Sequence, residues 1–147
     1  MIVEQISVFI ENKEGRLLEV AEILSQNNID ISALSLADNS EYGVLRMIVS
    51  DPYKAKEVLL QNGVIGKVTD VLAVVISDKP GGFCQALKQI SDNGISVKYM
   101  YACTSQQSGK AIMILSVTDL QKAEEIVKAG KADMEEPSDI YRIAKKQ

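Results

Sequence analysis

The chain has 147 residues, of which 46% are apolar, a formal net charge of −4 and no histidine. This composition fits a soluble globular protein, and no apolar stretch is long enough to cross a membrane as a helix. The acidic charge argues against nucleic-acid binding, which normally requires a basic surface. Without histidine the chain lacks the commonest general base and metal ligand, so we expect no catalytic centre, metal or cofactor.

Two cysteines, Cys84 and Cys103, do not make a disulfide framework, and the N-terminus has no secretory signal because Glu4 and Glu11 interrupt it. A reducing compartment suits both observations, so we expect a cytoplasmic protein.

An internal repeat divides the chain into two halves. A shift of 66 residues places Ile6–Leu17 on Leu72–Phe83, which superposes an apolar strand, an Asn/Asp-Lys turn and a glycine. After the next two strands the shift becomes 68 residues, as if the second hairpin loop were longer. The repeat therefore predicts two small domains, residues 1–69 and residues 70–147. Each has roughly 70 residues, near the lower limit for a self-sufficient core.

Each half reads as strand, helix, strand, strand, helix, strand. The first half predicts strands at 2–10, 30–37, 42–50 and 66–69, with helices at 15–26 and 52–62. Asp51 is the expected N-cap of the second helix, followed by proline in its first turn. The second half predicts strands at 71–77, 96–103, 110–117 and 140–143, with helices at 82–91 and 120–130.

This order predicts an α+β fold in which each half forms an antiparallel sheet with two helices on one face. The strand at 71–77 is apolar on both of its faces. The face without helices must therefore be covered, and we expect the other repeat or a second chain in a homodimer to cover it.

Both halves place glycines between the first strand and the first helix, in Asn12-Lys13-Glu14-Gly15 and Asp78-Lys79-Pro80-Gly81-Gly82. The first amides of a helix lack intrahelical partners and carry the positive end of its dipole, so the carboxylate of an amino acid suits this position. Asn12 or Asp78 could accept hydrogen bonds from an ammonium group. A purely structural turn has the same residues, and both interpretations stay open.

The second loop, its helix and the following Asn93-Gly94-Ile95-Ser96-Val97 resemble the ACT domain, a βαββαβ module of the ferredoxin-like type that binds amino acids and regulates metabolic enzymes. The resemblance covers nearly the whole chain as two tandem copies. The first copy departs from the pattern, because Glu14 stands where proline is usual and Asn28-Ile29-Asp30-Ile31 replaces Gly-Ile-Asn-Ile. Ligands of the family usually lie between two modules, held by this loop and by the second strand of a neighbouring module.

The resemblance implies twelve effector-binding residues: Asn12, Gly15, Arg16, Leu17, Asp30 and Ile31 in the first half, and Asp78, Gly81, Gly82, Phe83, Ser96 and Val97 in the second. Arg16 has a counterpart without a side chain, Gly82. Arg16 either holds a carboxylate or is a solvated surface arginine.

The resemblance implies a regulatory protein, not an enzyme. It would bind a free amino acid, form a homodimer and modulate a metabolic enzyme on another chain. Two alternatives remain. One is a scaffold that only mediates oligomerisation, and the other is a small enzyme that uses the anion site at the helix N-terminus. Amino-acid binding would distinguish the regulator from the scaffold, and turnover without a partner would indicate the enzyme.

Overall fold

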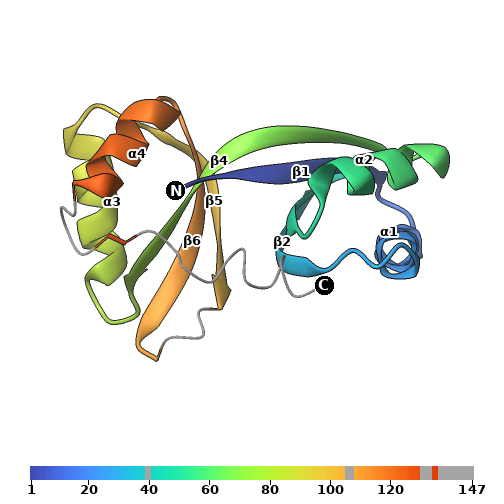
Figure 1. Ribbon diagram of the computed structural model, residues 1–147, viewed down its shortest axis with the longest axis horizontal. Helices are drawn as coiled ribbons and strands as arrows, with labels where there is room; N and C mark the ends of the chain where they lie inside the picture. Colours follow the sequence, from blue (N-terminus) through green and yellow to red (C-terminus); the bar gives the residue numbers. More distant parts are fainter. Residues whose placement is uncertain (39–40, 105–107, 130–133, 136–147) are drawn as a thin grey trace. The chain divides into compact units, whose positions relative to one another are not determined.

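The computed structural model describes residues 1–38, 41–104, 108–129 and 134–135 (Figure 1). Its residues group into two compact units. The first module comprises residues 4–69, and the second module combines residues 1–3 with the described residues from 70 onward. The N-terminal residues belong to the second module because the carbonyl of Met1 accepts a hydrogen bond from the Ala73 amide at 2.9 Å.

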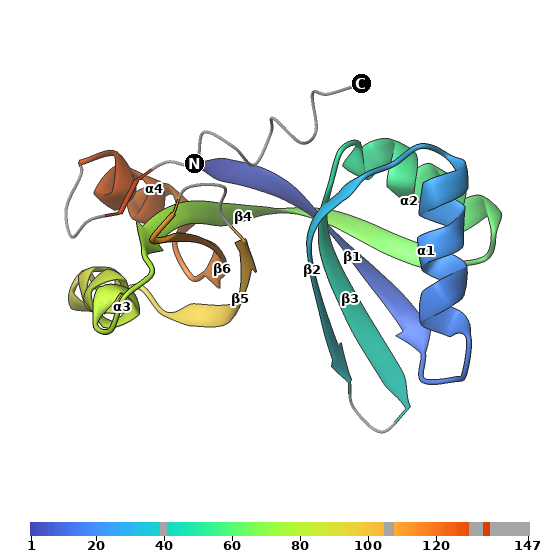
Figure 2. The same ribbon diagram turned by 90° about the horizontal axis from the view of Figure 1, so that it is seen from below.

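The first module has the predicted order of elements. They are β1 (Ile2–Glu11), α1 (Arg16–Gln26), β2 (Ile31–Asp38), β3 (Tyr42–Val49), α2 (Pro52–Gln61) and the beginning of β4 (Ile65–Ser77). The strands follow the order β2-β3-β1-β4, with β2 at the edge. Figure 2 shows α1 and α2 on one face of the sheet that β1, β2 and β3 form.

Alternating apolar residues build the core of this module. Ile6, Val8 and Ile10 of β1 point toward the helices, because every second side chain of a strand lies on the same face. They meet Leu24 of α1 and Leu59 of α2, both fully buried. The period of two in the strand and the helical spacing in α1 therefore fix which face of the sheet the helices cover.

The second module repeats this arrangement with the rest of β4, α3 (Gly82–Asp92), β5 (Val97–Thr104), β6 (Lys110–Val117) and α4 (Leu120–Lys128). Its strands follow the order β4-β6-β5, with β5 at the edge. Both strand contacts of β6 are antiparallel. The predicted strand at 140–143 lies outside the described residues. On the side of β4 away from β6, Glu135 and Val75 exchange two backbone hydrogen bonds, of 2.8 and 3.0 Å.

The strands predicted at 66–69 and 71–77 are one strand, since β4 runs without a break for 13 residues. The segment between them, Thr69-Asp70, contains neither glycine nor proline, so nothing in the local sequence interrupts the extended backbone.

The duplicated sequence reproduces its hydrogen bonds. Asp51 caps α2 by accepting from the Lys54 amide at 2.9 Å, and Asp119 caps α4 by accepting from the Lys122 amide at 3.0 Å. Two further hydrogen bonds recur in both modules. Lys54 Nζ donates to the Asn27 carbonyl at 2.8 Å, and Lys122 Nζ donates to the Asn93 carbonyl at 2.7 Å. The amides of Asp30 and Ser96 donate to the hydroxyls of Ser50 and Thr118, at 3.0 and 2.9 Å. The framework of the two modules is therefore equivalent.

The longest helices of the described chain, α1 and α3, have 11 residues each. None of the described helices is long and apolar enough to cross a membrane.

Candidate functional site

The helix α1 begins at a glycine that leaves its first amides open. Gly15 has a φ of 83°, a left-handed conformation that glycine adopts at little cost, and no side chain caps the helix. The amides of Arg16 and Glu19 are bonded to the carbonyls of Lys13 and Gly15. Those of Leu17 and Leu18 make no hydrogen bond within the described part of the chain. Two donors at the positive end of the helix dipole thus remain available to an anion.

A cavity of about 300 Å³ lies beside these amides. The end of β1, the loop before α1 and the ends of β2 and β3 surround it, with the lining residues Ile10, Glu11, Asn12, Lys13, Arg16, Leu17, Leu36, Asp38 and Gly43. Hydrogen bonds fix this loop to the β2–β3 hairpin. The Asn12 amide donates to the Glu41 carbonyl at 3.1 Å, and Asn12 Nδ2 donates to Asp38 Oδ2 at 3.4 Å.

Charged side chains form a chain of ion pairs that begins in the wall of this cavity and extends to Glu19 outside it. Arg16 Nη1 lies 2.8 Å from Glu19 Oε2, and Arg16 Nη2 lies 3.8 Å from Glu11 Oε2. Lys13 Nζ contacts the same Glu11 oxygen at 2.8 Å. The hydrogen bond and charge of Lys13, with a smaller contribution from Arg16, hold the pKa of Glu11 below its ordinary value. Glu19, and more weakly Glu11, raise the pKa of Arg16.

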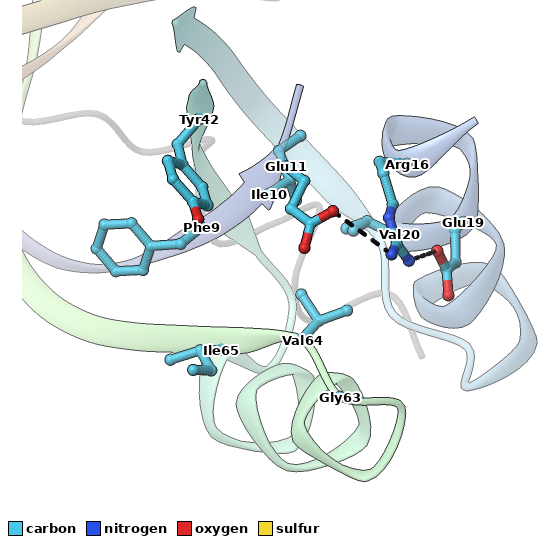
Figure 3. Close-up of a pocket in the computed structure, with 10 residues that line it drawn as sticks. All are labelled: Phe9, Ile10, Glu11, Arg16, Glu19, Val20, Tyr42, Gly63, Val64 and Ile65. Atoms are coloured by element: carbon cyan, nitrogen blue, oxygen red, sulfur yellow. Dashed lines mark hydrogen bonds and ion pairs between the residues drawn. The ribbon is translucent and has the colours of Figure 1, made fainter. Parts of the chain in front are cut away.

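Figure 3 shows that Arg16 extends between Glu11 and Glu19 at the edge of a second cavity. This cavity has a volume of about 230 Å³ and lies on the other side of Arg16, toward the start of β4. Its remaining lining is mostly apolar and includes Phe9, Ile10, Val20, Tyr42, Val64 and Ile65. Arg16 therefore borders both cavities, as Ile10 and Glu11 do.

The second module builds the equivalent loop without these charges. Gly81 has a φ of 91° and starts α3 without a side-chain cap. The next residue, Gly82, takes the position of Arg16 but packs on the end of β4, where a Cβ would overlap the Ser77 carbonyl oxygen. Glycine is therefore required at this position. The Asp78 amide donates to the Gly109 carbonyl at 2.8 Å, as Asn12 does to Glu41.

A groove of about 740 Å³ runs along α3 to the start of β5. Its lining residues are Phe83, Cys84, Leu87, Lys88, Ile90, Ser91, Ile95, Ser96 and Val97. Lys88 is the only charged one among these lining residues. The groove is thus a largely apolar surface with one basic group, in contrast to the ionic cavity of the first module.

The structure brings some predicted site residues together and separates others. Asn12, Arg16 and Leu17 line one cavity, next to Gly15. Asp30 and Ile31 lie at the opposite end of α1, which spans about 16 Å for its 11 residues. In the second module Phe83, Ser96 and Val97 line the groove, whereas Asp78 and Gly81 belong to the loop before it.

Sequence reasoning missed six residues of the first cavity: Ile10, Glu11, Lys13, Leu36, Asp38 and Gly43. It also missed Glu19, the nearer partner of Arg16. The spacing of Arg16 and Glu19, i and i+3 on a helix, was a usable signal. No sequence signal pointed to Asp38 and Leu36, because the pairing of β2 with β3 is what brings them to the cavity.

The fold and the loops define a class of protein: two tandem βαββαβ modules, each with a glycine-initiated helix beside a cavity or groove. The sequence profile of the ACT domain pair matches residues 1–144. The chain belongs to the ACT domain pair family.

Solved structures agree with this assignment. Protein BT0572 from Bacteroides thetaiotaomicron is 37% identical and has a TM-score of 0.87, with 97% of each chain covered. The regulatory subunit of aspartate kinase from Thermus thermophilus is 14% identical, with a TM-score of 0.63 and coverage of 88% of this chain and 94% of that one. Its counterpart from Thermus flavus is 16% identical, with a TM-score of 0.64 and coverage of 88% and 92%. At such identities the two Thermus proteins show the shared fold alone. No match to a curated protein was found.

Proposed function

We propose that the chain is a regulatory protein that binds a free amino acid at the loop before α1 and modulates an enzyme carried on a separate chain. The observation that carries this proposal is the difference between the two helices of the first module. An aspartate side chain caps α2, whereas α1 begins at an uncapped glycine beside a cavity of about 300 Å³. The capping group of α1 is left for a ligand to supply.

The cavity offers groups for both ends of an amino acid. The carboxylate would accept from the open amides of Leu17 and Leu18, with Arg16 close by. The ammonium group would donate to the carboxylate of Asp38, at the end of β2, or of Glu11, at the end of β1. Leu36, exposed at 46%, would contact the side chain of the ligand. Groups of both charges thus line one small cavity, which suits a zwitterion.

Regulation in trans is the second part of the proposal. Two structures with this fold are named as regulatory subunits of aspartate kinase, and we extend the same kind of role, action on a separate enzyme chain, to this protein. The ligand would change the partner only if it binds two arrangements of the protein with different affinities.

A thermal-unfolding screen against the twenty amino acids, each at about 5 mM, tests the binding step. A ligand at about 100 times its dissociation constant adds roughly 2.7 kcal/mol, which corresponds to a rise in Tm of about 5 to 10 °C for modules of this size. We expect one amino acid, or several with similar side chains, to give this rise in Tm. Arg16→Gln should diminish it, because it removes the charge nearest to the open amides.

Lys56→Gln is the matched control, since it removes one positive charge from an exposed position of α2 in the same module. It should leave the rise unchanged. A flat profile for all twenty amino acids would contradict the proposal and favour the scaffold. A rise that Arg16→Gln does not alter would place the ligand elsewhere, and turnover of an amino acid by the purified chain would indicate an enzyme.

A further inference from the structure

The second cavity, between Arg16 and the start of β4, combines buried apolar lining with large apolar side chains that reach solvent. Val20 belongs to its lining and is almost completely buried. Phe9, Tyr42 and Ile65 also line it, but they are exposed at 49%, 53% and 65%. Figure 3 shows Phe9 and Tyr42 on the side of the cavity away from Arg16. A ligand with an apolar body would remove this surface from water, which favours binding.

The charged lining of the second cavity contains one acid in excess, since it consists of Glu11, Glu19 and Arg16. Both terminal nitrogens of Arg16 are directed at these carboxylates. Each contact uses only the Oε2 atom of its glutamate, and Lys13 contacts the same Oε2 of Glu11. In Figure 3 the other oxygen of Glu11 points toward Val64, which also lines the cavity. A cation can therefore use this oxygen, whereas an anion would have to displace a carboxylate from Arg16.

The second module places its own side chains at the equivalent corner. Lys110 takes the place of Tyr42, since Tyr42 pairs with the last residue of β1 and Lys110 with the last residue of β4. Lys110 Nζ lies 2.6 Å from Glu135 Oε1, and the backbone of Glu135 is bonded to Val75, the counterpart of Phe9. Val75 is buried, whereas Phe9 is half-exposed. The second module thus supplies an ammonium group where the first has an aromatic ring beside a cavity.

We propose that the second cavity is a binding site for an organic monocation, a primary amine on an apolar body without a carboxylate. Its ammonium group donates to the available oxygen of Glu11, and Glu19 adds to the negative potential. Its apolar body lies against Phe9 and Tyr42, whose ring faces attract a cation. The volume of about 230 Å³ admits about eight non-hydrogen atoms, at the roughly 30 Å³ that one water occupies in the liquid. The site is separate from the amino-acid site, which lies on the other side of Arg16.

Benzylamine is the probe that tests this site, because it matches the size and joins an ammonium group to an aromatic ring. It is titrated into the full-length chain without amino acid, and nitrogen-15 NMR follows the backbone amides. We expect saturable shifts concentrated at residues 9–11 and 63–65. Benzyl alcohol has nearly the same shape without the charge, so its dissociation constant should be higher on the order of 10-fold or more. Benzoate should leave these amides unshifted. The absence of saturable shifts there, or equal binding of the alcohol or benzoate, overturns the proposal.

Two substitutions import residues of the second module into the cavity. Tyr42→Lys places an ammonium group there, and Glu19→Gln, which copies Gln85, removes the excess negative charge. Each should raise the dissociation constant of benzylamine on the order of 10-fold, through repulsion or loss of attraction. Tyr42 is exposed and Glu19 half-buried, so both variants should fold as the wild type does, which circular dichroism and Tm verify.

Tyr53→Lys and Glu22→Gln are the matched controls, because they make the same changes at exposed positions that do not line the cavity. They should leave the dissociation constant unchanged. A constant that neither cavity variant raises, or that the controls raise equally, overturns the proposal. Tyr42 and Glu19 do not line the first cavity, so a failure of amine binding is distinct from a failure of the amino-acid site.

Discussion

The loops before α1 and α3 descend from one duplicated segment, yet they are constructed differently. In the first module Glu11, Arg16 and Glu19 form a chain of ion pairs beside the open helix terminus. In the second module the corresponding residues are Ser77, Gly82 and Gln85, and no charge remains among these three. Gly82 is buried, and its backbone packs against the strand end that precedes the loop.

The framework around the two loops did not diverge in the same way. The Asp51 and Asp119 caps, and the lysine side chains that reach the end of the preceding helix, are matched to within 0.1 Å in their hydrogen-bond lengths. Structural contacts were kept while the groups facing the cavities changed. The two modules thus share one framework and differ at their first loops.

The largest effect that separates the two loops is expected at Gly82. Gly82→Ala places a Cβ on the Ser77 carbonyl oxygen, a backbone atom that cannot move aside cheaply. We expect a loss of about 1–3 kcal/mol in the free energy of unfolding, measured by urea denaturation. Arg16→Ala, at the equivalent position of the first module, is the control and should cost less than about 1 kcal/mol, because it breaks only exposed ion pairs. Equal losses for the two variants would mean that the loops are packed alike.

The caps should show the opposite behaviour, a smaller effect that is equal in the two modules. Asp51→Ala and Asp119→Ala each remove a carboxylate that accepts from a first-turn amide. We expect each to lower the free energy of unfolding by about 1 kcal/mol. Asp51→Asn and Asp119→Asn keep an acceptor and should recover most of the loss. Values that differ by more than twofold between the modules would contradict the equivalence of their frameworks.

Much of the fold could be predicted because its signals are local. The alternation of Ile6, Val8 and Ile10 and the capping position of Asp51 can be recognised within a few residues of sequence, and the repeat is found by comparing the two halves directly. Within the described residues the backbone adopts the predicted elements with small shifts at their ends, while the strand predicted at 140–143 lies outside them. The continuity of β4 was the main difference, since the sequence was divided there into two strands by analogy with a repeat boundary.

The site was less predictable because it depends on strand register. Asp38 and Glu11 approach the same cavity only because β3 pairs with both β1 and β2, so that the ends of the outer strands meet at one edge. Nothing within either short segment indicates this. The contact of Met1 with Ala73 is likewise set by chain topology, over 72 residues of sequence. The acidic residues of the proposed amino-acid site could therefore be identified only from the structure.

The smallest effect concerns the ionisation of Glu11, whose pKa is lowered from its ordinary value of 4.5, chiefly by the hydrogen bond from Lys13. A carboxyl whose pKa is depressed in the folded state stabilises the protein at pH values above the pKa that it has in the unfolded chain. That contribution is lost as the pH falls through the lower, folded value. Lys13→Met should raise the pKa of Glu11 toward 4.5, as followed by carbon-13 NMR of the side-chain carboxyl during an acid titration.

Lys79→Met is the matched control, because Lys79 occupies the same position of the second loop, where Ser77 replaces Glu11. It should leave the Glu11 titration unchanged. An unaltered pKa in Lys13→Met would show that the lysine does not hold this carboxylate in solution. Glu11 would then be free to accept the ammonium group of a ligand without displacing Lys13.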